Sequence, residues 1–294
     1  MKVEYDFPPY RPPSEAYSCL IRFTRGCPWN KCKFCMMYKK IKFEKREINE
    51  ILRDIHNAPL IFGPETETVF IGDSDSLLMK TEDLVFLLNE IRKVFPKLKR
   101  ITSYARIRTL KAKGVENLKK LREAGLTRVH IGLESGSDNV LKLINKGPKA
   151  KHFIETAPII REANIEFCFY VLLGIGGRKY THEHAIETAK VINEAKPDFV
   201  RFRTIIPIPG SELYKMIENG EFEYLTNAEI IYEQLKIIEN INVDTYIAND
   251  HISNLVAIEG RLLENKDYFI NVLKEALRYY GNEVRNYKEL IRYL

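Results

Sequence analysis

Short apolar runs followed by amphipathic stretches recur along the first two thirds of the chain. One such run, Thr-Val-Phe-Ile-Gly-Asp, covers residues 68–73 and is typical of a buried strand. The segment after it carries apolar side chains at helical spacing, namely Leu84, Leu87, Leu88, Ile91 and Phe95. We therefore expect a buried strand followed by an amphipathic helix, with Thr81 as the N-cap of that helix.

This pairing of a strand with helical material recurs through six predicted strands. The strands are expected at residues 18–25, 68–73, 100–106, 127–134, 165–173 and 198–205. The other helices are expected near 46–57, 113–124, 138–146, 151–162, 182–195 and from Ser211 onward. Strands that alternate with helices indicate a parallel sheet with right-handed crossovers, and six units are fewer than the eight of a closed barrel.

One face of several predicted strands is polar. Between Thr127 and Glu134 the polar positions alternate with apolar ones: Arg128, His130, Gly132 and Glu134. Arg201 and Arg203 occupy one side of their strand in the same way. A doubly wound sheet covered by helices would be apolar on both faces. The predicted fold class is therefore α/β, a partial (β/α)6 parallel barrel whose concave face holds polar ligands, with a C-terminal helical extension.

Three regions are predicted along the chain. Residues 1–17 contain four prolines and are expected to form an N-terminal arm, 18–220 to form the barrel, and 221–294 to form a helical extension packed on it. Within the extension we expect helices at 226–240 and 266–280, a last helix up to Leu294, and a polar loop at 246–255.

The composition is that of a soluble globular protein. Hydrophobic residues make up 45% and charged residues 29% of the 294 residues, and no apolar run is long enough for a membrane helix. The first residues have no apolar core like that of a signal peptide, so we expect a cytoplasmic protein whose thiols stay reduced. The net charge of +6 permits an anionic partner such as RNA but does not require one.

Three of the five cysteines lie close together in one polar loop. Cys27, Cys32 and Cys35 have the spacing Cys-x4-Cys-x2-Cys directly after the first predicted strand. Loops that leave the carboxyl ends of parallel strands usually build the active site. Closed structural metal sites use four protein ligands, whereas reactive sites leave one position open. The sequence thus predicts a metal or iron–sulfur site with three protein ligands, against the alternative of a chance cluster.

This arrangement resembles the radical S-adenosylmethionine (SAM) superfamily. The resemblance implies that the three cysteines bind a [4Fe–4S] cluster, whose fourth iron binds the amino and carboxylate groups of SAM. The commonest spacing in the family is Cys-x3-Cys-x2-Cys, so this chain has one extra residue between Cys27 and Cys32. Phe34, just before Cys35, matches the aromatic residue that lies near the adenine in the family.

Further motifs follow successive predicted strands over most of residues 18–215. Gly72-Asp73-Ser74 stands where the family often has Gly-Gly-Glu, and only its first glycine matches. The segment 132–137 resembles the fourth-strand segment of the coproporphyrinogen-dehydrogenase and methylthiotransferase branches, and 173–177 resembles the fifth-strand segment that supports adenine. Residues 204–210 resemble the sixth-strand exit. The SAM contacts implied are Gly72, Asp73, Glu134, Ser135, Gly174, Ile175 and Gly176.

Several charged residues have more than one candidate role. Arg106 and Arg203 are candidates for the SAM carboxylate or for an anionic substrate. Glu134 could instead pair with Arg106 or Arg128. We expect His130 to form hydrogen bonds and His182 and His184 to lie at the surface. We expect His251 to lie in a polar loop.

Cys19 and Cys168 are too few to hold a second cluster. This argues against the methylthiotransferases and against peptide-modifying members with auxiliary clusters. The predicted protein is a radical SAM enzyme with one cluster, which cleaves SAM to a 5′-deoxyadenosyl radical that abstracts hydrogen from its substrate. The residue that acts on the substrate is not identified by the sequence.

The expected partners are SAM, a small-molecule or RNA substrate, and a reduced ferredoxin or flavodoxin-type electron donor. The enzyme would be an oxidoreductase or a transferase of an anaerobic or low-oxygen cytoplasm, with no membrane partner. The alternative is a zinc or iron–sulfur protein that acts as a scaffold or transfers electrons without SAM. Zinc has no clear fourth ligand in this loop, because the nearest histidine, His56, lies well outside it.

Overall fold

The computed structural model describes residues 10–281 and 283–284. Within these residues eight strands belong to one mostly parallel sheet. They are β1 (Cys19–Arg22), β4 (Thr68–Gly72), β5 (Arg100–Tyr104), β6 (Leu126–Glu134), β7 (Glu166–Leu173), β8 (Phe199–Thr204), β9 (Tyr246–Ala248) and β10 (Glu259–Arg261). The short strands β2 (Thr24–Arg25) and β3 (Glu44–Lys45) pair separately and antiparallel.

The chain divides into two compact units. The first takes in the described residues up to 30 together with 37–131 and 158–167. The second takes in 31–36, 132–157 and the described residues from 168 onward. The predicted boundaries at residues 17 and 220 follow a different principle, the alternation of strands and helices, and stay a prediction.

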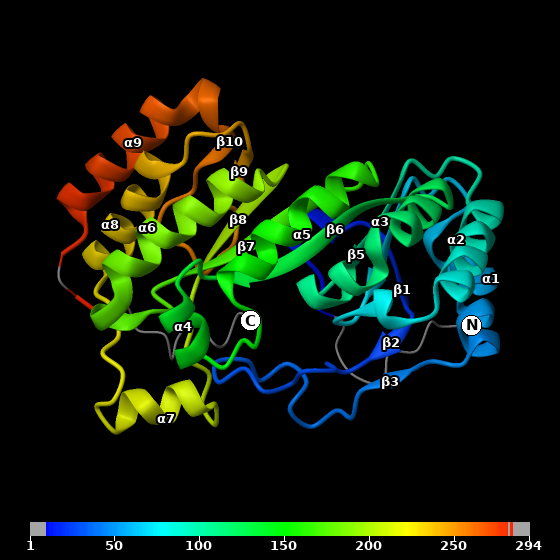
Figure 1. Cartoon of the computed structure of the whole chain (residues 1–294), viewed down its shortest axis with the longest axis horizontal. Coiled ribbons are helices and arrows are strands. Elements are labelled where there is room, and N and C mark those ends of the chain that lie inside the picture. The colour runs from blue at the N-terminus through cyan, green and yellow to red at the C-terminus, as the bar shows by residue number, and fades with distance from the viewer. Residues whose placement is uncertain (1–9, 282, 285–294) are drawn as a thin grey trace. The chain divides into compact units, whose positions relative to one another are not determined.

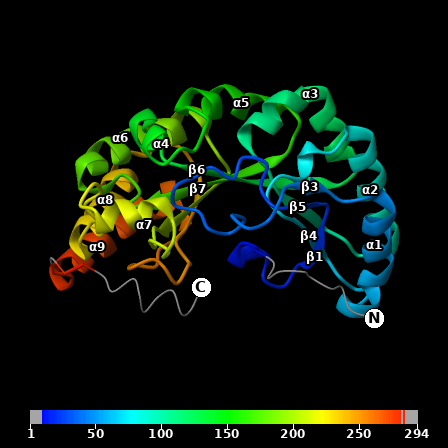
Figure 2. The same ribbon diagram turned by 90° about the horizontal axis from the view of Figure 1, so that it is seen from below.

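In the first unit the strands run in the order β1-β4-β5-β6, and each neighbouring pair is parallel. The helices α1 (Ile48–Phe62), α2 (Thr81–Val94) and α3 (Ile107–Glu123) lie side by side along one face of these strands (Figures 1 and 2). The other face carries the ring of Phe70, whose centroid lies 5.0 Å from that of Tyr104 and 6.0 Å from that of His130. One side of this sheet is thus apolar and the other mixes aromatic and polar side chains, as predicted.

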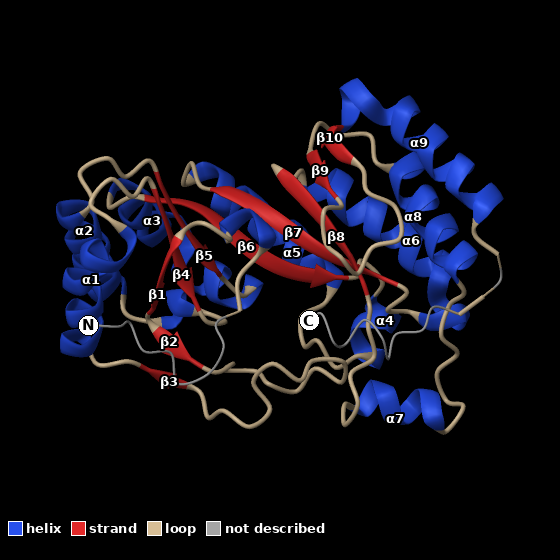
Figure 3. Cartoon of the chain, turned by 180° about the vertical axis from the view of Figure 1, so that it is seen from behind, coloured by secondary structure: helices blue, strands red, loops and turns tan. Residues whose placement is uncertain are grey.

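In the second unit β7, β8 and β9 are parallel neighbours, and β10 returns antiparallel to β9. The helices α6 (Gly177–Ala195), α8 (Asn227–Asn240) and α9 (Leu262–Tyr279) pack in that order beside these strands (Figure 3). Two short helices, α4 (Asp138–Leu143) and α7 (Glu212–Glu218), lie near the exits of strands, and α5 (Ala150–Glu162) precedes β7.

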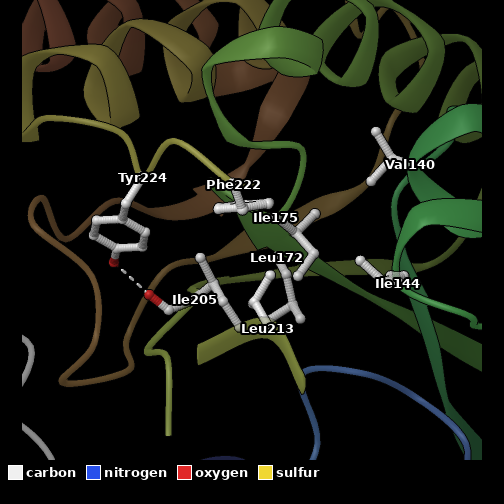
Figure 4. Packing of buried hydrophobic residues seen from close by; sticks show 8 residues of the cluster. All are labelled: Val140, Ile144, Leu172, Ile175, Ile205, Leu213, Phe222 and Tyr224. Carbon is white, nitrogen blue, oxygen red and sulfur yellow. Dashed lines mark hydrogen bonds between the residues drawn. The ribbon is translucent and has the colours of Figure 1, made fainter. Parts of the chain in front are cut away.

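A buried apolar cluster links the strand exits of the second unit to its short helices. Its members are Val140, Ile144, Leu172, Ile175, Ile205, Leu213, Phe222 and Tyr224. Figure 4 shows these side chains converging from different segments, with Tyr224 Oη donating a 2.6 Å hydrogen bond to the carbonyl of Ile205. The cluster therefore fixes the loops that follow β7 and β8.

The fold class is confirmed, and four details differ from the prediction. Lys80, not Thr81, is the N-cap of α2, and it makes no side-chain capping bond. The third helix begins at Ile107 and not near 113, and a non-helical Gly114 with φ of 69° interrupts it. The short 3-10 segments η1 (Pro13–Glu15) and η2 (Ser76–Leu78) were not foreseen.

The fourth difference concerns residues 246–255, which were predicted to be a loop. They begin with β9, which pairs with β8 and is the seventh parallel strand of the sheet. The antiparallel β10 follows beside β9. β9 has only three residues before the polar Asn249 and Asp250, so its apolar pattern is too short to show in the sequence. The predicted last helix up to Leu294 lies mostly outside the described residues. Among the described helices, none is long and apolar enough to cross a membrane.

Candidate functional site

The second and third cysteines of the loop lie on a segment that is fixed through its backbone. Lys33, between Cys32 and Cys35, donates its N–H to the carbonyl of Ile144 at 2.9 Å and accepts the N–H of Leu213 at 3.0 Å. Ile144 caps the end of α4 and Leu213 belongs to the first turn of α7. These two contacts use the backbone of Lys33, so the position of the segment does not depend on its side chain.

Phe34 continues this anchoring with its side chain. It packs, partly buried, against the apolar cluster that contains Ile144, Ile175 and Leu213. Ile175 follows β7 in the segment that was predicted to support adenine. The structure therefore brings together two predicted SAM contacts, Phe34 and Ile175, that are far apart in the sequence.

The first cysteine, Cys27, belongs to the first unit and follows the short strand β2. Gly26 has φ of 71°, and a Cβ there would lie 3.0 Å from the carbonyl oxygen of Lys42, so a larger residue would not fit. Asn30, also with positive φ, donates its backbone N–H to Cys27 Sγ at 3.4 Å and its side-chain amide to the carbonyl of Tyr38 at 2.6 Å. These bonds hold the part of the loop that contains the extra residue.

The donor chemistry of the three cysteines fits a cluster ligated by thiolates. None of the three takes part in a disulfide within the described residues, and all three are partly exposed, whereas Cys19 and Cys168 are buried. Burial raises the pKa of the Cys19 thiol to about 12, which keeps it protonated and unsuited to ligation. Within the described residues no three His, Cys, Asp or Glu side chains converge on a metal-sized site. Cys27 belongs to one compact unit, and Cys32 and Cys35 belong to the other.

Gly72 and Asp73 lie at the exit of β4, as predicted. Asp73 has φ of 55° and is buried, and its carboxylate accepts a 3.3 Å hydrogen bond from Tyr38 Oη. Its second carboxylate oxygen lies 3.7 Å from a guanidinium nitrogen of Arg22. The Asp73 side chain is thus occupied by protein groups, and what the turn offers to a ligand is its backbone.

Arg106 lies beside the cysteine loop of the first unit. Its guanidinium carbon is 5.5 Å from the centroid of the Trp29 ring. Its backbone N–H is donated to Asp75 at 3.1 Å, and Thr109 donates its hydroxyl to the same carboxylate at 2.6 Å. Burial raises the pKa of Asp75 to about 6, and this carboxylate fixes the backbone of Arg106 next to the loop.

Glu134 ends β6 in the left-handed region, with φ of 64°. Its carboxylate forms a 2.6 Å ion pair with Lys146, so the alternative considered for Glu134, a pairing with Arg106 or Arg128, is wrong. Arg128 instead binds Glu166 through two nitrogens, at 2.9 and 2.7 Å. The partner of Glu134 comes from the loop after α4, which the strand pattern did not place near it.

A buried polar network behind the strand exits escaped the sequence prediction. His184, expected at the surface, is fully buried in α6, and its Nδ1 lies 2.8 Å from Ser135 Oγ. Its Nε2 lies 3.6 Å from Glu233 Oε1. Glu233 of α8 accepts the N–H of Gly174 and the hydroxyl of Thr181, both at 2.6 Å. Ser135 and Gly174 are predicted SAM contacts, so the network holds both of their loops.

Burial controls the charge of this network. It raises the pKa of Glu233 to about 7 and lowers the pKa of His184 to about 3. The imidazole is therefore neutral at pH 7. A signal for Glu233 did exist in the sequence, because it is an acidic residue among the apolar residues Ile230, Ile231, Leu235, Ile237 and Ile238, which share the buried part of α8 with Gln234.

The turn after β7 carries the three predicted residues that would support adenine. Gly174 has φ of 79°, and a Cβ there would lie 3.2 Å from Ile205 Cγ2. Ile175 is fully buried, and Gly176 is the N-cap of α6. The remaining candidate, Arg203, lies near the end of β8, where its guanidinium carbon is 5.3 Å from the centroid of the Tyr170 ring.

Comparisons with known proteins agree on one family. The family model described as the radical SAM superfamily matches residues 21–192. The heme chaperone HemW of Buchnera aphidicola (subsp. Schizaphis graminum) is 24% identical over 316 aligned positions, which cover 90% of this chain and 82% of that protein. The tRNA uridine(34) acetyltransferase of Methanocaldococcus infernus is 24% identical over 117 positions, and these cover 40% of this chain and 22% of that protein.

Solved structures give the same fold. Coproporphyrinogen III oxidase (HemN) of Escherichia coli, described as a radical SAM enzyme, matches with a TM-score of 0.57 and 16% identity. The match covers 76% of this chain and 50% of that one. Methylornithine synthase (PylB) matches with a TM-score of 0.54 and 18% identity over 94% of this chain and 85% of the other.

Proposed function

The chain belongs to the radical SAM superfamily, and from this premise we propose that it generates a radical from SAM on one [4Fe–4S] cluster ligated by Cys27, Cys32 and Cys35. Members of the family are enzymes whose cofactors are this cluster and SAM. Bound there, the cluster would supply the one electron that cleaves SAM into methionine and a 5′-deoxyadenosyl radical, and this radical would take a hydrogen atom from the substrate. The electron would come from a reduced ferredoxin or flavodoxin-type protein.

The observation that carries this proposal is the packing of Phe34 on the apolar cluster that contains Ile175. A cysteine segment and the turn after β7 meet there through apolar side chains. We assign the adenine of SAM to this surface, where Phe34 would offer a ring face and the turn at Gly174 and Gly176 would offer its backbone. Burial of Ile175 keeps this part of the site free of water.

The polar contacts of SAM are assigned to the exits of β4 and β6. The side chains of Asp73 and Glu134 already bind Tyr38 and Lys146, so we assign a SAM-binding role to the backbone of Gly72–Asp73 and of Glu134–Ser135. Arg106, stacked on Trp29 of the cysteine loop, is the cation assigned to the SAM carboxylate.

Anaerobic reconstitution tests this function. The enzyme should turn brown, bind about four irons per chain, and release 5′-deoxyadenosine when SAM and a reductant are added. Cys32→Ala should lose the cluster and the product, whereas Cys168→Ala, which removes a buried thiol outside the loop, should keep both. An intact, reducible cluster that does not cleave SAM would refute the proposal.

A second outcome would favour the alternative function. Stoichiometric zinc in a colourless native protein without affinity for SAM would indicate a scaffold protein. We also propose that the enzyme is an oxidoreductase or a transferase of a low-oxygen cytoplasm. Its division into an arm, a barrel and a helical extension is likewise part of the proposal. The named activities of HemW and the tRNA acetyltransferase belong to those proteins.

A further inference from the structure

A group of polar side chains lies on one face of the second unit, apart from the segments assigned to SAM. Tyr170 of β7 pairs in register with Arg201 of β8, and Arg203 is two residues further along the same face. The loop that leaves the end of β9 adds Asp250 and His251. We call these five residues the β8 arginine cluster. It lies toward the carboxyl end of its strands, where parallel sheets bind their ligands.

The two arginines of the cluster differ in their partners. Arg201 binds Asp250 through one guanidinium nitrogen that is 2.9 Å from each carboxylate oxygen, so the charges of this pair cancel. Arg203 makes no ion pair or hydrogen bond within the part of the chain that the structure describes, and its guanidinium lies over the Tyr170 ring. Stacking on the ring leaves the edge of the guanidinium available for a planar anion. The cluster therefore carries one uncompensated positive charge.

His251 adds a neutral donor to this charge. Its Nδ1 accepts the backbone N–H of Ser253 at 3.1 Å and lies 2.8 Å from Ser253 Oγ, which in turn accepts the N–H of Thr204 at 3.2 Å. Because Nδ1 accepts a backbone N–H, the proton of the neutral ring is on Nε2. Burial first, then the charge of Arg203, lowers the pKa of His251 to about 4, while Asp250 acts in the opposite direction.

Resting on the function proposed above, we propose that Arg203 and His251 bind the carboxylate group of a small-molecule substrate. The guanidinium of Arg203 supplies a planar, charged fork for the two carboxylate oxygens, and Nε2–H of His251 supplies a second donor. Arg201 and Asp250 do not touch the substrate; they hold the loop that presents His251. Tyr170 positions Arg203 because its ring packs against the guanidinium.

The charge of the cluster selects the class of ligand. One net positive charge matches one carboxylate, which has a single negative charge at pH 7. An RNA backbone carries a charge at every phosphate and calls for several cations in a row. Here the second arginine is neutralised by Asp250, so a small carboxylic acid fits this site better than RNA.

The test uses the reconstituted enzyme with acetate as the probe and inorganic phosphate as a second arm. Imidazole nitrogen signals of the histidines would be followed by NMR at constant ionic strength, and the loss of one signal in His251→Ala assigns His251. Acetate should shift this signal with a saturable curve, and Arg203→Gln should weaken acetate binding by about tenfold or more. Arg128→Gln, which removes an arginine paired with Glu166 in the other unit, should leave acetate binding unchanged.

SAM cleavage without substrate separates the two proposals. The unmodified enzyme should release 5′-deoxyadenosine from SAM without substrate, and Arg203→Gln should keep the iron content and brown colour of the reconstituted enzyme, which shows that the variant folds. Arg203→Lys, which keeps the charge but not the fork, should bind acetate more weakly than the unmodified enzyme and more tightly than Arg203→Gln. If neither the unmodified enzyme nor a variant cleaves SAM, the proposed function fails. The acetate titration still reports on the β8 arginine cluster.

Three results would overturn the inference. The His251 signal could respond to phosphate and not to acetate, which would exclude a carboxylate receptor. Acetate binding could be equal in Arg203→Gln and the unmodified enzyme. Arg203→Gln could instead raise the KM for SAM with acetate binding retained, which would make Arg203 a ligand of the cofactor.

Discussion

Glu233 shows how one buried residue can hold the two loops to which we assign SAM contacts. Its two carboxylate oxygens accept the N–H of Gly174 and the hydroxyl of Thr181, and one of them approaches His184, which contacts Ser135. The carboxylate has no direct place in the chemistry. Its role is to fix the turn after β7 and, through α6, the loop after β6.

We expect the Glu233→Gln variant to change the pH dependence of stability. The pKa of Glu233 is raised to about 7 by burial, so its stabilising contribution is full below about pH 4.5 and is lost as the pH rises through 7. A glutamine does not titrate. The free energy of unfolding of the unmodified enzyme minus that of the variant should therefore fall by on the order of 2 kcal/mol between pH 5.5 and 7.5.

Urea unfolding at both pH values measures this difference. His184, whose lowered pKa gives stability that is lost as the pH falls below about 6.5, is present in both proteins, so its effect cancels in the comparison. Equal differences at pH 5.5 and 7.5 would show that Glu233 keeps one charge state throughout.

At the scale of elements, the loop after β6 packs directly against the backbone of α6. A Cβ on Gly136 would collide with the backbone of Glu187 and Thr188, and backbone atoms cannot move aside cheaply. Gly136 N–H also donates to Thr188 Oγ1 at 2.9 Å. The loop that contains Ser135 is thus set by a close approach that only glycine allows.

We expect Gly136→Ala to lower the free energy of unfolding by about 2 kcal/mol or more, because the added methyl group forces α6 away from the loop. Gly281→Ala is the matched control, since no atom of the described residues lies within 4 Å of a Cβ there. Chemical denaturation of both variants gives the comparison. A loss of the same size in the two variants would point to a general effect of alanine and not to the contact with α6.

The capping box that starts α8 offers a second test at this scale. Thr226 accepts the N–H of Glu229 at 3.2 Å, and the Glu229 carboxylate accepts the N–H of Thr226 at 2.8 Å. Thr226→Ala should destabilise the protein by about 1 kcal/mol, whereas Thr226→Ser should preserve most of the stability because serine also caps. Thermal unfolding measures both, and equal midpoints for the alanine and serine variants would rule out the capping contribution.

At the scale of the whole molecule, the sequence predicted the strand order that follows from alternation but not the contacts that depend on tertiary packing. The six strands up to Thr204 repeat a long, readable pattern, and each was found within a few residues of its predicted bounds. β9 was missed because three residues are too few for a period, and it forms because β8 offers it a free edge.

The candidate site divides in the same way. The cysteines and the glycine turns could be predicted because their chemistry depends on local spacing and backbone conformation. The partner of Glu134, the burial of His184 and the hydrogen bond of Thr204 to Ser253 beside His251 depend on which loops come together, and no local pattern encodes that. Phe34 is intermediate: its place beside Cys35 suggested its role, and its packing against the Ile175 cluster supports that role.

The burial of Cys19 and Cys168 has a consequence for work with this protein in air. Both thiols are withdrawn from solvent, and that of Cys19 stays protonated because its pKa is about 12. Oxidants and alkylating reagents react with exposed thiolates. A thiol titration of the folded chain without cofactor should therefore count Cys27, Cys32 and Cys35, the proposed cluster ligands, and not the total cysteine. The fraction of protein that can still accept a cluster after exposure to oxygen can thus be read from a simple colour reaction.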